Sequence, residues 1–257
     1  MPTLLPRRGV SAAALLSILV APLAAQTAPP PAASGPPALT AADLEAFLDG
    51  VVPLSLKSNG VVGAVVSVVK DGQNLFAKGY GWADRENEVP VDPDRTLFRV
   101  ASISKLFTAT AVMQLVEQGK LDLDEDIATY LDIQLERRFP DKITLRHLLT
   151  HTAGFEESFK EIPTDSGQGV PLREWIAKAA PAFLYRPGTV TSYSNYGSDL
   201  AGYIVERVSG MPFPEYIRVN ILEPLGMVSS SIAQPLPPDL MSRLSKEYKG
   251  RAPDSAG

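Results

Sequence analysis

The chain has 257 residues, of which 45% are hydrophobic and 21% are charged, a balance typical of a globular protein long enough to bury one sizeable core. Its 24 Lys and Arg residues against 29 Asp and Glu residues give a formal net charge of −5, which excludes the basic surface that nucleic acid would need. The chain has no cysteine, so disulfides, thiolate metal ligands and a thiol nucleophile are excluded and covalent chemistry must use oxygen or nitrogen.

The first 25 residues have the order of an export signal. Arg7 and Arg8 precede a short apolar run over 10–20 and then a stretch of small residues that ends at Ala25. The run is shorter than the roughly 20 apolar residues that span a bilayer, so a cleaved signal is favoured over a membrane anchor. We therefore expect an exported protein, periplasmic or secreted, with no stable membrane span.

Residues 26–39 are rich in proline and alanine, a composition typical of an extended linker. The folded domain is expected over 40–257. Thr40 is placed to cap a first helix, whose apolar residues recur with helical spacing. These residues are Leu44, Phe47, Leu48 and Val51.

Two β-branched and aromatic runs, 61–69 and 75–82, flank Asp71-Gly72, a strong signal for an antiparallel hairpin. The stretch 102–118 is apolar nearly all round and ends at Gly119, which predicts a buried central helix.

Four further stretches have helical patterns, and the middle of the chain is therefore mostly helical. They cover 144–150, 172–179, 195–208 and 213–221. We predict one α/β unit, in which an antiparallel sheet packs with helices beside a mostly helical region. After Gly226 no convincing strand follows, so the strands needed to complete the sheet are expected to be missing from the C-terminal part of the chain.

The most informative motif is Ser102-Ile103-Ser104-Lys105. Positions i and i+3 of a helix lie on one face, so the Lys105 ammonium can reach the Ser102 hydroxyl and activate it as a nucleophile. Taken alone, the motif also fits a capping serine followed by a solvated lysine.

The second motif is Tyr193-Ser194-Asn195. A tyrosine near a lysine ionises more easily and can act as a general base or proton relay, and the Asn195 amide can contact both the lysine and a substrate carbonyl. The simpler alternative is a loop in which Asn195 caps the next helix.

Together with the stretches 148–154 and 223–227, these two motifs resemble the penicillin-recognising serine hydrolases in order and spacing, from about residue 39 to at least residue 227. This group includes class C β-lactamases, D-alanyl-D-alanine carboxypeptidases and β-lactamase-like esterases, and the resemblance implies a β-lactamase/transpeptidase-like fold. It implies that Ser102 is the nucleophile, Lys105 its proton acceptor, Tyr193 the general base or proton relay, and Asn195 a contact to lysine and substrate. The Tyr-x-Asn form argues against the class A type.

The resemblance also implies acyl transfer without metal or organic cofactor. The substrate is a small molecule or a peptidoglycan peptide: a β-lactam, a D-Ala-D-Ala stem peptide or a carboxylic ester. One departure stands out, because no Lys-Thr-Gly or His-x-Gly motif follows Asn195. In the family, this third motif offers one of two oxyanion-hole amides, and the loss of one such donor lowers rates roughly a hundred- to a thousandfold. A non-catalytic binding or regulatory relative is therefore the main alternative.

A second alternative is a zinc hydrolase. His147 and His151 are four residues apart, which is the spacing of two ligands on one helical face. No cysteine or third histidine is present to complete a site. We expect His151 to be a structural turn residue and His147 to face solvent.

Overall fold

The computed structural model describes residues 38–157 and 170–248. The predicted export signal over 1–25 and nearly all of the predicted linker lie outside the described residues. The chain divides into two units after Thr40, and every element described below belongs to the second, Ala41–Gly257. Among the described residues, no helix combines the length and the apolar character needed to cross a membrane.

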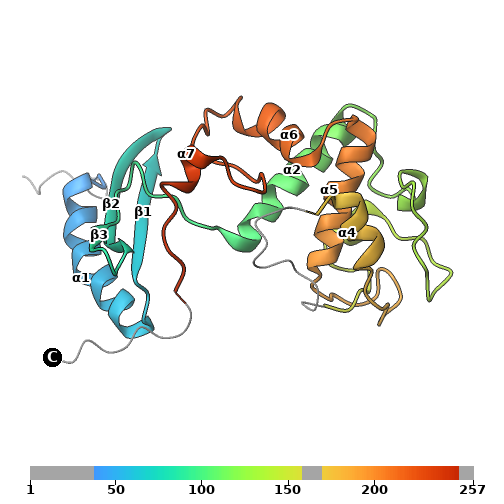
Figure 1. Cartoon of the computed structure of the whole chain (residues 1–257), viewed down its shortest axis with the longest axis horizontal. Coiled ribbons are helices and arrows are strands. Elements are labelled where there is room, and N and C mark those ends of the chain that lie inside the picture. Colours follow the sequence, from blue (N-terminus) through green and yellow to red (C-terminus); the bar gives the residue numbers. More distant parts are fainter. Residues whose placement is uncertain (1–37, 158–169, 249–257) are drawn as a thin grey trace, which may run out of the picture. The chain divides into compact units, whose positions relative to one another are not determined.

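The N-terminal part consists of one helix and a small antiparallel sheet, with strand order β1-β2-β3 (Figure 1). Its elements are α1 (Ala41–Asn59), β1 (Gly63–Lys70), β2 (Gln73–Asp84) and β3 (Val89–Pro90). Asp71 and Gly72 turn between β1 and β2 with φ of 52° and 75°, as a tight hairpin turn with two left-handed residues requires. The predicted hairpin is confirmed, whereas the short β3 was not predicted.

Helix α1 packs against β2. Lys78 Nζ donates hydrogen bonds to Glu45 and Asp49 at 2.7 and 2.9 Å, and the Tyr80 hydroxyl donates to Asp49 at 3.0 Å. These bonds tie the polar residues of the helix to the face of β2.

The predicted apolar face of α1 is only partly covered. Leu44 and Leu48 are half-buried, but Phe47 and Leu54 are 64% and 68% exposed, and Val51 is exposed as well. The described residues contact only one side of the helix, and part of its apolar face lies outside that contact. Likewise, the described residues after β3 form isolated bridges and no further strand, so the outer edge of β1 is unpaired within this part of the chain.

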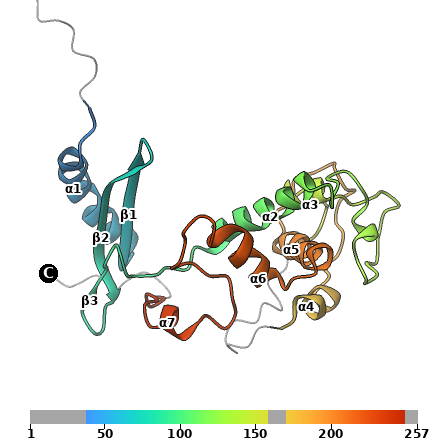
Figure 2. The same cartoon turned by 90° about the horizontal axis from the view of Figure 1, so that it is seen from above.

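The remaining elements are helical (Figure 2). They are η1 (Ala101–Ser104), α2 (Lys105–Glu117), η2 (Ile127–Thr129), α3 (Leu145–Leu149), α4 (Leu172–Lys178), α5 (Asn195–Ser209), α6 (Phe213–Ile217), the π-helical turn η3 (Arg218–Leu222) and α7 (Pro238–Met241). The four predicted helical stretches are thus confirmed, with the last divided between α6 and η3.

The prediction that α2 is buried on all sides is wrong. Ala111, Val112 and Leu115 are buried, but Leu106 is 66% exposed and Met113 is also exposed. The central helix is α5, which packs against α2, α3, α4 and α6. An apolar composition alone does not identify the most buried helix, because small residues also decide how closely neighbours approach.

Gly202 of α5 illustrates such a close approach. A Cβ atom at this position would lie 3.2 Å from the ring of Phe213 in α6. The glycine therefore lets the aromatic ring of α6 lie directly on α5.

Candidate active site

Ser102 lies in η1 and Lys105 is the first residue of α2. Lys105 Nζ donates a hydrogen bond to Ser102 Oγ at 3.1 Å. The backbone of Ala101, immediately before the serine, is left-handed with φ of 45°, a conformation that is strained for alanine. The alternative of a capping serine with a solvated lysine does not describe this geometry, because the side chains of both residues face each other.

Tyr193 and Asn195 lie at the start of α5. Ser194 is the N-cap of this helix, and its side chain accepts a hydrogen bond from Gly197 N at 3.1 Å. The interpretation of Asn195 as the cap is therefore wrong, because the capping hydroxyl comes one residue earlier and Asn195 is already helical. The residues on either side of this cap are Tyr193 and Asn195, and their side chains face the start of α2.

The four predicted site residues meet at the N-terminal end of α2. The hydroxyl groups of Tyr193 and Ser102 are 2.7 Å apart, and Asn195 Oδ1 accepts a hydrogen bond from Lys105 Nζ at 2.7 Å. Lys105 Nζ also lies 5.1 Å from the centre of the Tyr193 ring. One serine hydroxyl is thus bonded to both groups that could take its proton.

The electrostatics of the site favour ionisation of the phenol. The cation of Lys105, followed by the Ser102 hydroxyl, lowers the pKa of Tyr193, because both groups stabilise the phenolate. Tyr193 is 43% exposed. Its hydroxyl therefore lies where a substrate arriving from solvent can meet it.

Glu157 is a site residue that sequence reasoning missed. Its carboxylate accepts a hydrogen bond from Asn195 N at 3.0 Å and another from Asn195 Nδ2 at 2.5 Å. The two residues are 38 positions apart in sequence, and no local pattern marks the glutamate. It could have been found only from a fold that places the turn after α3 against the start of α5.

Among the residues that the structure describes, the two histidines are not part of a zinc site of the kind that the alternative hypothesis requires. His151 has a left-handed backbone with φ of 55°, and its ring stacks on Tyr193 with 4.4 Å between centroids. His147 is half-buried rather than facing solvent, which corrects that prediction, and burial lowers its pKa. Within residues 38–157 and 170–248, no group of three or more His, Cys, Asp or Glu side chains is arranged to hold a metal ion.

A cavity of about 170 Å³ adjoins Ser102 and Lys105. Side chains of Leu106, Ala109 and Leu149 give it an apolar wall, and His151 also lines it. An apolar group attached to a carbonyl can therefore lie beside the nucleophile.

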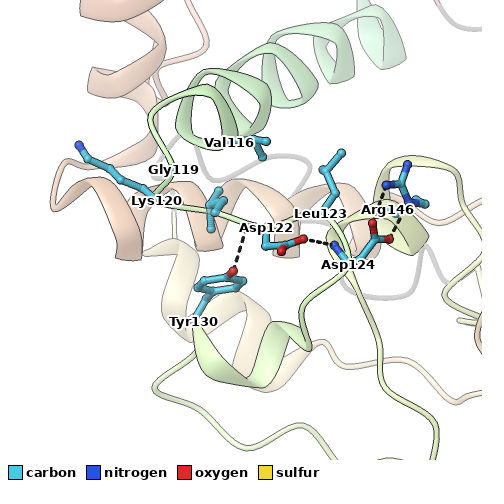
Figure 3. Close-up of a pocket in the computed structure, with 9 residues that line it drawn as sticks. Val116, Gly119, Lys120, Asp122, Leu123, Asp124, Tyr130 and Arg146 are labelled. Atoms are coloured by element: carbon cyan, nitrogen blue, oxygen red, sulfur yellow. Dashed lines mark hydrogen bonds and ion pairs between the residues drawn. The ribbon is translucent and has the colours of Figure 1, made fainter.

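A larger hollow of about 520 Å³ lies at the other end of α2 (Figure 3). There Tyr130 accepts a hydrogen bond from Asp122 N, and the ionised groups of Asp124 and Arg146 pair with each other at 2.7 Å. The carboxylates of Asp122 and Asp124 both have hydrogen-bond partners within the hollow, and we assign no chemistry to it.

Comparison with known proteins places these features in context. A family model described as Beta-lactamase matches residues 26–255. Esterase EstB of Burkholderia gladioli is 36% identical over 205 residues, which cover 74% of this chain and 52% of that protein.

Solved structures are similar as well. The octameric penicillin-binding protein homologue from Pyrococcus abyssi is 34% identical with a TM-score of 0.63, covering 71% of this chain and 43% of that one. The β-lactamase/D-alanine carboxypeptidase from Pseudomonas syringae is 29% identical with a TM-score of 0.66, covering 80% and 55%. The chain thus spans about half the length of the proteins it matches.

Proposed function

The chain belongs to the beta-lactamase family and has its fold, and we propose that it acts as an exported serine hydrolase by acyl transfer. The observation that carries this proposal is the double hydrogen bond of the Ser102 hydroxyl, to Lys105 Nζ at 3.1 Å and to the Tyr193 hydroxyl at 2.7 Å. A serine hydroxyl needs a neighbour that takes its proton before it becomes a good nucleophile, and here two such neighbours are in contact with it.

The reaction proceeds in two steps. Ser102 Oγ bonds to the substrate carbonyl carbon while its proton passes to the deprotonated Lys105–Tyr193 pair, and the pair returns that proton to the leaving group as the acyl bond breaks. Water then attacks the acyl-enzyme, gives a proton to the same pair and releases the acid as Ser102 regains its hydrogen. Asn195 Oδ1 orients Lys105 Nζ by accepting a hydrogen bond from it at 2.7 Å.

We propose carboxylic esters as the first substrate class, because EstB is an esterase by name and is 36% identical over 74% of this chain. β-Lactams and D-Ala-D-Ala peptides are the next candidates, since the Pseudomonas syringae protein is named for both a β-lactamase and a D-alanine carboxypeptidase activity. Export is proposed from the residue order of 1–25, and the mass of the mature chain from its host tests that part directly.

The alternative is a protein that binds such ligands without turning them over. The similarity to a penicillin-binding protein homologue supports it. The two functions differ in whether a covalent adduct forms on Ser102 and whether it is released.

The intact mass of the chain after reaction tests the proposal. The probes are p-nitrophenyl butyrate, benzylpenicillin and a fluorophosphonate, whose adduct is not released by water. We expect an adduct in the wild-type chain and in Ser104→Ala, a matched control because Ser104 makes no side-chain cap bond, and no adduct in Ser102→Ala. A folded wild-type chain that none of the probes modifies would contradict the hydrolase proposal. A butyryl or penicilloyl adduct that persists would favour the binding alternative.

A further inference from the structure

His151 contacts the chain on both sides of Tyr193. Its carbonyl oxygen accepts a hydrogen bond from Ser192 N at 2.7 Å, and its Nδ1 atom accepts one from Ser194 N at 3.3 Å. Its ring lies against the Tyr193 ring, with 4.4 Å between centroids and 36° between planes. One residue therefore contacts the tyrosine ring and bonds the backbone N–H groups of both neighbouring residues.

These contacts define the protonation state of the imidazole. A backbone N–H can only donate, so His151 Nδ1 must accept and the ring proton of the neutral form must lie on Nε2. In the protonated form, both ring nitrogens are donors. Protonation of His151 would therefore break the bond to Ser194 N and turn two N–H groups towards each other.

The surroundings oppose that protonation. The Lys105 cation of α2 lies near the His151 ring. Glu157, in the turn that also contains His151, contributes the only negative charge that acts on the ring among the described residues. The start of α5 adds the Tyr193 phenol. Burial first, and then the charge of Lys105, lower the pKa of His151, and both causes favour the neutral ring.

We propose that His151 is a positioning residue of the acyl-transfer site: in its neutral form it holds the Tyr193 hydroxyl against Ser102, and when protonated it releases that hydroxyl. The inference rests on the proposed function for its role in the reaction, but the hold on Tyr193 can be measured without turnover. The proposal adds His151 to the four motif residues, as a residue that acts on the reaction only through Tyr193.

Two substitutions separate the parts of this role. His151→Phe keeps a ring that can stack on Tyr193 and removes the acceptor. His151→Asn removes the ring and keeps an acceptor, because Asn Oδ1 occupies the place of His Nδ1, and asparagine tolerates the left-handed backbone at this position. His147→Phe is the matched control, because His147 is a half-buried histidine of the same segment that has no hydrogen bond or ring contact with Tyr193 among the described residues.

The experiment measures the ionisation of Tyr193 by NMR in a chain labelled with 13C at tyrosine Cζ, with the resonance assigned by Tyr193→Phe. In the wild-type chain we expect Tyr193 to titrate below an ordinary tyrosine and to show a small shift at the acid pH where His151 takes up a proton. His151→Phe should move the titration up towards that of an ordinary tyrosine and abolish the acid shift, whereas His147→Phe should change neither. An unchanged Tyr193 titration in a folded His151→Phe chain would overturn the proposal.

If His151→Phe does not fold, His151→Asn carries the test. It should keep the lowered Tyr193 titration and lose the acid shift, and an acid shift that persists would overturn the proposal. Where the fluorophosphonate modifies Ser102, its rate should fall about a hundredfold in His151→Phe, as expected when a catalytic group is displaced by about 1 Å. A wild-type chain with the NMR behaviour above but without an adduct would refute the hydrolase proposal and leave the hold of His151 on Tyr193 established.

Discussion

Glu157 determines which way the amide of Asn195 faces. Because the carboxylate has no proton to donate, only the NH₂ end of the amide can face it, and the amide oxygen must then point to Lys105 Nζ, where it lies at 2.7 Å. The same carboxylate accepts the first free backbone N–H of α5, where the helix dipole favours a negative charge.

Replacing Glu157 with glutamine should therefore slow acylation of Ser102. The new side chain can donate as well as accept, so the Asn195 amide is free to flip and Lys105 loses its partner; we expect a loss of about ten- to a hundredfold. The rate of fluorophosphonate labelling measures it. Glu156→Gln is the control, since Glu156 is exposed, and equal rates in both variants would refute the role of Glu157.

Removing the hydroxyl of Tyr193 should have a larger effect. Tyr193→Phe keeps the ring stacked on His151 but removes a proton acceptor, and groups of this kind contribute about 10² to 10⁴ in rate. Ester hydrolysis in Tyr193→Phe and Tyr185→Phe can be compared directly, because Tyr185 is a similarly exposed tyrosine in the preceding loop. Since the pKa of Tyr193 is lowered, wild-type activity should rise with pH at a pH below the ordinary tyrosine range, and a flat profile would contradict this assignment.

Asp199 is predicted to limit stability at neutral pH. Burial raises its pKa, so the folded state binds a proton more readily than the unfolded state, and stability increases as pH falls from neutral towards the ordinary value of 3.8. Asp199→Asn keeps an oxygen for Trp175 Nε1, which donates at 3.1 Å. We expect this variant to raise the free energy of unfolding at pH 7, with a gain that shrinks towards pH 4.

Urea unfolding at several pH values measures that difference. The exposed Asp94 supplies the control Asp94→Asn, which should behave like wild type. A gain in Asp199→Asn that is independent of pH would show that the charge of Asp199 is not its cause.

His147 is predicted to have the opposite pH dependence. Its Nδ1 atom is buried without a hydrogen-bond partner among the described residues, and burial lowers its pKa. The unfolded chain takes up this proton first, so the stability attributable to neutral His147 is lost as pH falls through about 6.5, its ordinary pKa.

His147→Phe should consequently stabilise the chain by about 1 kcal/mol at pH 7, because it replaces an unpartnered polar atom with an apolar one. It should also reduce the loss of stability between pH 7 and pH 5. Thermal unfolding at both pH values measures the two effects, and a slope identical to that of wild type would contradict the assignment to His147.

Local patterns predicted most of the elements and marked as candidates the four motif residues that lie together in the structure, because caps, turn residues and the i, i+3 spacing act over a few positions. The hairpin at Asp71-Gly72 and the helix that follows Thr144 are of this kind. Glu157 and His151 acquire their partners only when the turn after α3 meets the start of α5, about forty residues later. The exposure of Phe47 could not be predicted either, since periodicity identifies the apolar face of a helix and not the residues that cover it.

The left-handed backbone of Ala101 has a consequence for laboratory evolution. Only glycine and, to a lesser degree, asparagine adopt this conformation readily, so a screen for heat resistance should recover Ala101→Gly beside the nucleophile, and Asn at His151 for the same reason. Both changes relieve backbone strain at positions that orient a reacting side chain, Ser102 in one case and Tyr193 in the other. Selection for a higher melting temperature would then first change the residues that determine turnover. Stability and activity should therefore improve at each other's expense.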